Sequence, residues 1–146
     1  MRILLSTVSS DSHTWNLVFL QLLLEESGHE VVNLGPCVPD QLLVETARQE
    51  CPDAIVISSV NGHGHLDGAR LIRAVRADRD VRHIPALIGG KLGIRGNDNI
   101  EYARGLKDAG FDEVFTEGSD PERLGDWLAA LPVGAAPQLL GAEVGQ

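Results

Sequence analysis

Short apolar segments alternate with longer amphipathic segments along most of the chain. Five apolar runs of four to six residues each end in polar, glycine or proline residues, as strands do where they enter loops. These runs predict strands at residues 3–8, 31–34, 54–57, 85–88 and 113–116. The segments between and after them predict helices at residues 16–26, 39–50, 67–77, 99–109 and 121–131.

Five successive strand–helix units indicate the α/β class. The third run, residues 54–57, is apolar at every position, as a central parallel strand covered on both faces requires. We therefore expect one open five-stranded parallel sheet with helices on both faces, most simply in the flavodoxin-like (Rossmann-like) strand order 2-1-3-4-5. The domain is expected to span residues 1–131. The Gly-, Ala- and Pro-rich residues 132–146 predict a flexible C-terminal tail.

Composition excludes several classes of function. The 146 residues suffice for one domain, and 12 Lys and Arg against 21 Asp and Glu give a net charge of −9, which repels nucleic acid. No apolar run is long enough to span a membrane or to resemble a signal peptide. Cys37 and Cys51 alone form neither a disulfide framework nor a zinc site. We expect a cytoplasmic protein with free thiols.

The residues with distinctive chemistry follow the first, third and fourth strands. Asp11 and His13 follow the first strand, the pair Ser58-Ser59 ends the third, and Gly89-Gly90 ends the fourth. In this strand order, ligands bind beyond the carboxyl ends of strands 1 and 3, where the chain reverses direction. A carboxylate that accepts one imidazole N–H fixes the histidine for metal ligation. Glycines at strand ends let a flat or elongated ligand approach the backbone.

Other ligands of this fold class fit less well. A response-regulator receiver needs an aspartate after strand 3 and a lysine after strand 5, where this chain has Ser58-Ser59 and Thr116-Glu117. No G-x-G-x-x-G follows the first strand, which excludes the usual dinucleotide site. A flavodoxin-type electron carrier is an alternative, because the first loop is rich in Ser and Thr. That alternative does not explain an aspartate and a histidine in the same loop.

Three motifs occur in the order and in the loops expected of a known family. Ser10-Asp11-Ser12-His13 is similar to a D-x-H-x-x-G motif, Ser58-Ser59-Val60 to an S-x-L segment, and Gly89-Gly90 to a G-G motif. Over residues 2–130 the chain resembles the cobalamin (B12)-binding domains, most closely the small subunits of glutamate mutase (methylaspartate mutase).

The resemblance implies that His13 is the axial ligand of the cobalt and that Asp11 supports it. It implies adenosylcobalamin as cofactor, with the displaced nucleotide tail in a slot between strands 1 and 3, beside Ser58, Ser59, Gly89 and Gly90. It also implies a separate large barrel subunit that binds substrate, for the rearrangement of L-glutamate to threo-3-methylaspartate, and no catalytic residue in this chain. The expected cofactor-binding residues are Ser10, Asp11, Ser12, His13, Thr14, Asn16, Ser58, Ser59, Val60, Gly62, Gly89, Gly90, Lys91, Leu92 and Gly93.

The chain departs from the family pattern at two positions. Asn16 replaces the motif glycine, where the family pattern implies close approach of the cofactor or an unusual backbone, and Val60 replaces the leucine of S-x-L. A non-catalytic cobalamin carrier or sensor, or a related module that has lost the cofactor, is therefore the alternative function. Without the resemblance, Asp11 reads as a helix N-cap.

A histidine pair and a row of arginines also stand out in the sequence, and both are interpreted as structural. His63 and His65, alone or with Asp67, resemble a zinc site, but two histidines make a poor one, and a flexible loop is favoured. A row of arginines predicts a solvated helix face rather than a surface for an acidic partner; its members are Arg70, Arg73, Arg76, Arg79 and Arg82.

Overall fold

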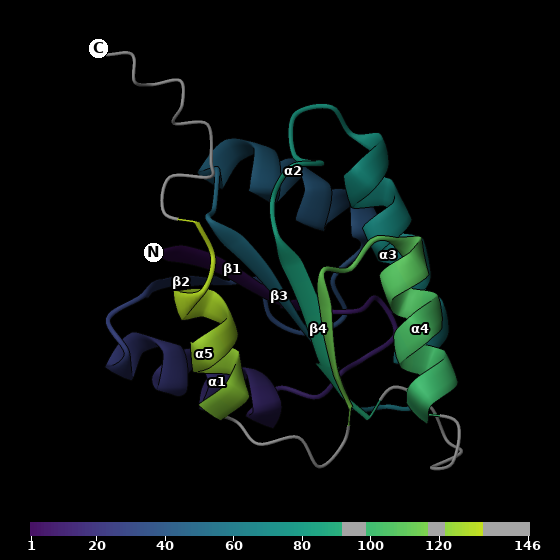
Figure 1. The fold of residues 1–146 in the computed structure, drawn as a ribbon, viewed down its shortest axis with the longest axis horizontal. Coiled ribbons are helices and arrows are strands. Elements are labelled where there is room, and N and C mark those ends of the chain that lie inside the picture. Colours follow the sequence, from purple (N-terminus) through teal and green to yellow (C-terminus); the bar gives the residue numbers. More distant parts are fainter. Residues whose placement is uncertain (92–98, 117–121, 133–146) are drawn as a thin grey trace.

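The computed structural model describes residues 1–91, 99–116 and 122–132 (Figure 1). Five parallel strands form one sheet in the order β2-β1-β3-β4-β5, with helices on both faces. The predicted α/β fold class and strand order are therefore confirmed. The elements are β1 (Arg2–Thr7), α1 (Trp15–Glu26), β2 (Glu30–Asn33), α2 (Asp40–Glu50), β3 (Ala54–Ser59), α3 (Gly64–Ala77), β4 (Ala86–Gly90), α4 (Asn99–Ala109), β5 (Glu113–Thr116) and α5 (Glu122–Ala129).

The two faces of the sheet carry separate apolar cores. Successive residues of a strand point to opposite faces, so Ile55 and Ile57 pack with α2, α3 and α4, whereas Ala54 and Val56 pack with α1 and α5. We call these the α2–α4 face and the α1/α5 face. All six residues of β3 are buried, as expected for the central strand. Figure 1 shows α1 and α5 together on one side of the sheet and α3 and α4 on the other.

Several element boundaries differ from the sequence prediction by one to three residues, and those of α3 and β4 bear on the site. Helix α3 begins at Gly64, three residues earlier than predicted, because the amides of Leu66 and Asp67 already bond to the carbonyl oxygen of His63. Strand β4 continues through Gly90, because its two glycines pair with the end of β3. The predicted flexible loop at His63 and His65 is thus largely the first turn of a helix. Residues 133–146 of the predicted tail, like Leu92 and Gly93, lie outside the described residues.

The row of arginines predicted to be solvated is exposed at four positions, Arg70, Arg73, Arg79 and Arg82, but not at Arg76. Arg76 donates hydrogen bonds to the carbonyl oxygens of Arg82 and Ile84, which precede β4. It also donates to the carbonyl oxygen of Gly110 and pairs with Asp112, which precede β5, so it joins the two loops. The prediction is wrong for this residue, because the chain returns past α3 to bring these carbonyl groups within reach.

Both cysteines are exposed and free, as expected. In the described residues, no helix is both long and apolar enough to cross a membrane.

Candidate cofactor-binding site

The loop after β1 is built around one buried carboxylate. The chain turns at Val8–Asp11, where the amide of Asp11 donates to the carbonyl oxygen of Val8 over 3.1 Å. The Asp11 side chain is only 1% exposed, and its Oδ1 lies 2.7 Å from Nδ1 of His13. Its Oδ2 accepts hydrogen bonds from the amides of Val60, at 2.7 Å, and Asn61, at 3.2 Å. Asp11 therefore joins the loop after β1 to the loop after β3.

These contacts determine the ionisation of Asp11 and the orientation of His13. Burial by itself raises the pKa of Asp11, but hydrogen bonds from the amides of Val60 and His13 and from the His13 ring outweigh it, so the pKa lies below its ordinary value. An ionised carboxylate at this distance requires a proton on Nδ1 of His13. The lone pair of the neutral ring is then on Nε2, in a side chain that is 55% exposed.

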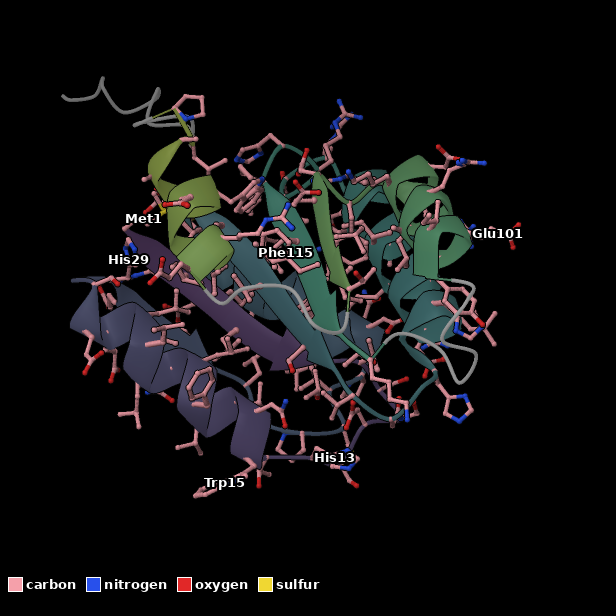
Figure 2. All side chains as sticks on the ribbon, turned by 60° about the horizontal axis from the view of Figure 1, so that its bottom comes forward. Met1, His13, Trp15, His29, Glu101 and Phe115 are labelled. Carbon is pink, nitrogen blue, oxygen red and sulfur yellow. The ribbon has the colours of Figure 1, made fainter. Side chains whose placement is uncertain are left out.

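Figure 2 shows where this histidine lies in the molecule. His13 is beyond the carboxyl ends of the strands, near Trp15 at the start of α1, whereas Met1 and His29 lie at the opposite end of the strands. The interpretation of Asp11 as a helix cap is wrong. Thr14 occupies the N-cap position of α1, and the cap has no side-chain hydrogen bond. Asp11 bonds across to the other loop instead.

The four predicted residues at the strand ends divide between the two faces of the sheet. Thr7, Ser58 and Gly89 are in register on β1, β3 and β4, and they continue the α1/α5 face beyond Leu5 and Val56. This face therefore ends in small residues on β1, β3 and β4, with Phe115 beside Gly89 on β5. Ser59 belongs to the opposite face with Ile57, so the prediction of one slot lined by Ser58, Ser59, Gly89 and Gly90 needs correction.

Ser59 and Gly90 have structural roles of their own. Ser59 is fully buried, and its Oγ has no hydrogen-bond partner within the described residues. Gly90 has a φ of +117°, and a Cβ there would lie 2.2 Å from the carbonyl oxygen of Ser59. The close approach of β3 to β4 thus requires glycine at position 90 without any ligand.

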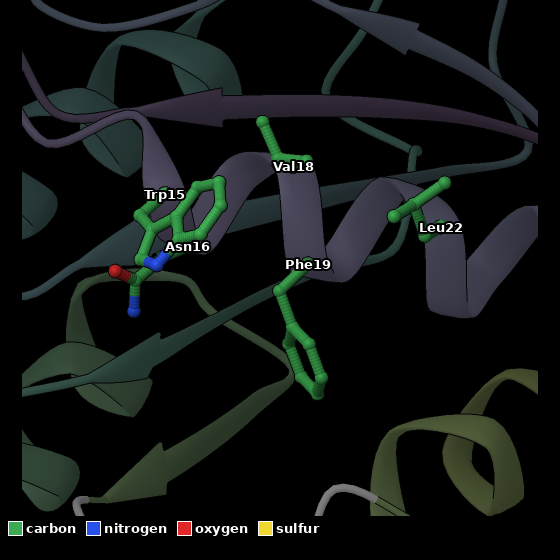
Figure 3. A pocket seen from close by; sticks show the side chains of 5 residues that line it. All are labelled: Trp15, Asn16, Val18, Phe19 and Leu22. Carbon is green, nitrogen blue, oxygen red and sulfur yellow. The ribbon is translucent and has the colours of Figure 1, made fainter.

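Asn16, in the place of the motif glycine, lies in the first turn of α1 and is exposed. In the described residues the only non-glycine residues with positive φ are Cys37 and Cys51, so position 16 needs no unusual backbone. The effect of the Asn16 side chain is on the space at the start of α1. With its neighbours on α1 it lines an open pocket of about 430 Å³ (Figure 3); these neighbours are Trp15, Val18, Phe19 and Leu22.

The histidine pair after β3 does not assemble the predicted zinc alternative. The ring of His65 packs against that of Tyr102, with centroids 4.3 Å apart. The carboxylate of Asp67 accepts hydrogen bonds from Ser10 and Arg70. Among the described residues, no group of three or more His, Cys, Asp or Glu side chains could hold a metal ion.

The other predicted residues surround the same edge. Ser10 is held by Asn61 and Asp67, whereas Ser12 and Thr14 are exposed on either side of His13. Val60 contributes its amide to Asp11, and the amide of Gly62 bonds to the carbonyl oxygen of Lys91. Sequence reasoning missed Asn61, Asp67 and Arg70 as supports of this loop. Their contacts join segments about fifty or more residues apart, which no local pattern indicates.

The donor set suits a metal that carries its other ligands with it. The site presents one imidazole, backed by a buried carboxylate, at an open edge of the sheet. One side-chain nitrogen completes the coordination of a metal held in a macrocycle, and the carboxylate increases the basicity of that nitrogen. The residues present therefore fit a cobalt corrinoid.

Comparison with known proteins supports the same family. The model of the B12 binding domain matches residues 1–124. A glutamate mutase sigma subunit from Fusobacterium nucleatum is 31% identical over 121 residues, which cover 83% of this chain and 88% of that protein. The glutamate mutase sigma subunit 2 of Haloarcula marismortui is 32% identical over 130 residues, covering 88% of this chain and 85% of that protein.

Solved structures agree on the fold. A cobalamin-binding protein from Desulfitobacterium hafniense has a TM-score of 0.69 at 22% identity; the match covers 90% of this chain and 59% of that chain. A response regulator from Desulfuromonas acetoxidans has a TM-score of 0.64 at 18% identity, covering 88% of this chain and 93% of that chain. At these identities the two structures show the fold alone. On the family match, and on its similarity to glutamate mutase sigma subunits, the chain belongs to the B12-binding domain family.

Proposed function

We propose that this chain is the cobalamin-binding small subunit of a glutamate-mutase-type isomerase. The observation that carries the proposal is the buried Asp11 carboxylate, 2.7 Å from His13 Nδ1, in a chain similar to glutamate mutase sigma subunits. His13 is the axial cobalt ligand through Nε2. Asp11 holds the proton on Nδ1 and keeps the ring in place, a contribution that is typically worth about 10- to 100-fold in metal affinity or activity.

In this proposal, the protein contributes orientation and ligation. When bound, adenosylcobalamin supplies a cobalt–carbon bond whose homolysis starts the rearrangement of L-glutamate to threo-3-methylaspartate. A large barrel subunit binds the substrate. The displaced nucleotide tail lies on the α1/α5 face along Thr7, Ser58 and Gly89, because these side chains are the smallest of that face at the strand ends.

Electron paramagnetic resonance of bound cob(II)alamin tests this assignment. The protein is labelled with nitrogen-15 histidine and compared as wild type, His13→Ala and His63→Ala, the last being an exposed histidine at the same edge. We expect a base-off spectrum with splitting from the labelled imidazole in the wild type and in His63→Ala, and loss of that splitting in His13→Ala. Labelled splitting that persists in His13→Ala contradicts the assignment of the axial ligand.

A second probe separates ligation from binding of the nucleotide tail. Cob(II)inamide has the corrin but lacks the nucleotide base, so its binding depends on His13 and not on the α1/α5 face. We expect the protein to bind cob(II)alamin more tightly than cob(II)inamide while coordinating both through the labelled histidine. Equal affinity for the two probes contradicts the proposed place of the tail.

The alternative is a cobalamin carrier or sensor without a mutase partner. Asn16 favours it, because the motif glycine is replaced by an exposed side chain three residues from His13. Copurification with a large mutase subunit from the same genome, followed by an assay for methylaspartate, separates the two functions. Cobalt ligation by His13 without complex formation supports the carrier.

A further inference from the structure

The turn that carries Asp11 is held from outside by α3. Ser9 and Ser10 are the two central residues of the Val8–Asp11 turn, and both hydroxyl groups bond to side chains of that helix. Arg70 donates from Nη2 to Ser9 Oγ over 2.7 Å, and Ser10 Oγ donates to the Asp67 carboxylate. Each central residue of the turn thus has its own side-chain partner on α3.

The two helix residues also bind one another. Arg70 donates to Asp67 over 3.1 Å and to Asp40, the first residue of α2, over 2.7 Å. The Asp67 and Asp40 side chains are 16% and 19% exposed and the Arg70 side chain is 51% exposed, so both ion pairs are shielded from water on the carboxylate side only. Pairs linked in a network hold side chains in place better than isolated surface pairs. We refer to these three residues, Asp40 of α2 and Asp67 and Arg70 of α3, as the Arg70 clamp.

The clamp rests on a part of α3 that is fixed to the sheet. Gly68 lies between Asp67 and Arg70, and a Cβ there would come within 2.7 Å of Ile88 Cδ1. Leu71 and Ile72 follow, and both are buried. This close packing fixes the height of the helix above β4. In contrast, the residues after the turn, from Ser12 to Asn16, are exposed.

A continuous path of contacts joins the clamp to His13. Ser10 Oγ accepts a hydrogen bond from the side-chain amide of Asn61 over 2.9 Å. The backbone amide of Asn61 donates to the Asp11 carboxylate, which in turn contacts the His13 ring. We propose that Asp67 and Arg70 are positioning residues that hold the Val8–Asp11 turn, and through it His13, in the orientation for cobalt ligation. The inference rests on the proposed function. Its physical basis is preorganisation, because a loop ordered before binding loses less entropy on binding.

The first test uses the protein without cofactor and compares Arg70→Met with Arg73→Met. Arg73 is an exposed arginine one turn further along α3, so the control removes the same charge from the same helix. We expect the amides of His13 and Val60, which bond to Asp11, to exchange hydrogen faster in Arg70→Met and at the wild-type rate in Arg73→Met. Unchanged exchange in Arg70→Met overturns the inference, whatever the protein binds.

The second test measures ligation of cob(II)alamin in the same proteins. In Arg70→Met we expect the dissociation constant to rise about 3- to 10-fold, less than the 10- to 100-fold typical of a group bonded directly to the metal ligand. The fraction of bound cobalt that shows splitting from labelled histidine should fall as well. Weaker binding with every bound cobalt still coordinated by histidine indicates a general loss of stability and overturns the positioning role.

A double-mutant cycle connects the effect to the turn. Ser9→Ala alone should weaken binding less than Arg70→Met, and adding it to Arg70→Met should have no further effect, because the shared contact is already lost. Strictly additive effects contradict the inference. Failure of the proposed function has a different signature: labelled splitting persists in His13→Ala.

Discussion

The two faces of the sheet end differently at the carboxyl edge. On the α2–α4 face, large buried side chains continue across the sheet as the registered row Ile57, Ile88 and Val114, and Ser59 beyond them is fully buried. On the α1/α5 face, the last registered row is Thr7, Ser58, Gly89 and Phe115, which is small on β1, β3 and β4 and large on β5. The last row of the α2–α4 face, Ser59, Gly90 and Thr116, is small as well, so the faces differ in packing: a Cβ at Gly90 would lie 2.2 Å from the Ser59 carbonyl oxygen, whereas a Cβ at Gly89 would lie 3.3 Å from its nearest neighbours, on Phe115.

The helices repeat this contrast. Helix α3 presses its glycine and buried leucine and isoleucine onto the sheet. Helix α1 leaves Trp15 79% exposed and Phe19 56% exposed. Both side chains line the pocket shown in Figure 3. Helix α3 is thus closely packed on the sheet, whereas α1 packs on it through Leu17 and Leu24 and exposes other apolar side chains to solvent. Asp11 joins the loops after β1 and β3, and the following variants test how the two faces differ.

The largest effect is expected at the tight end of β4. Gly90→Ala places a Cβ 2.2 Å from the Ser59 carbonyl oxygen at a φ of +117°. Left-handed backbone strain and overpacking together cost about 3 kcal/mol or more in the free energy of unfolding. Urea denaturation measures the loss. Gly105→Ala on α4 is the control: its Cβ meets nothing within 4 Å, so the helix should gain about 1 kcal/mol. Equal effects of the two variants would show that β3 and β4 are not closely packed.

The next largest effect is expected at Asp11, whose carboxylate joins the loops after β1 and β3. Asp11→Asn should lower the free energy of unfolding at neutral pH by about 2 kcal/mol, because several hydrogen bonds to a buried carboxylate are weakened or lost. Since the folded-state pKa of Asp11 lies below the ordinary value of 3.8, the stabilisation is complete well above that pH. It is lost as the pH falls below 3.8 toward the folded-state pKa.

The difference between wild type and Asp11→Asn should therefore shrink in acid, as measured by urea denaturation between neutral pH and about pH 3. Asp108→Asn, an exposed carboxylate on α4, is the control and should change stability little at any pH. A difference that stays constant across this range would show that Asp11 is not held as a carboxylate.

A smaller effect is expected for ligand binding on the α1/α5 face. Ser58→Val adds volume to the row of small residues while retaining a side chain that suits a strand. We expect the affinity for cob(II)alamin to fall about tenfold, which corresponds to about 1.4 kcal/mol, and the affinity for cob(II)inamide to stay unchanged. A parallel loss for both probes would locate the effect at His13 rather than at the proposed tail site.

The sequence predicted most of the fold because its signals are local. Apolar runs, glycines and prolines mark where strands and helices end, and the alternation of strands and helices restricts the topology to few choices. The sequence predicts the start of α3 too late because glycine is a weak helix former. Gly64 is tolerated there because it lies in the first turn, where its amide has no intrahelical partner.

The site was predictable only in part. The proximity of the Asp11 and His13 side chains follows from their spacing and is present in the structure. The placement of Ser58 and Ser59 on opposite faces of the sheet also had a local signal, because side chains alternate along a strand. The prediction of a single slot lined by both residues did not take this alternation into account. The partners of Asp11 on Val60 and Asn61, and those of Ser9 and Ser10 on α3, had none. They depend on how distant loops meet after folding.

The smallest effect tests whether the α2–α4 face is closed at its end. Ser59 and Ser6 are both fully buried, but Ser6 Oγ donates to the Thr7 carbonyl oxygen over 3.0 Å, whereas Ser59 Oγ has no partner within the described residues. Removing a satisfied hydroxyl costs about 1 kcal/mol, and removing an unsatisfied one relieves a desolvation penalty. We therefore expect Ser6→Ala to be destabilised and Ser59→Ala to be unchanged or up to about 1 kcal/mol more stable in urea denaturation. If Ser59→Ala instead weakens cob(II)alamin binding without a change in stability, the Ser59 hydroxyl takes part in binding. The division of labour between the two faces then fails at its most closely packed point.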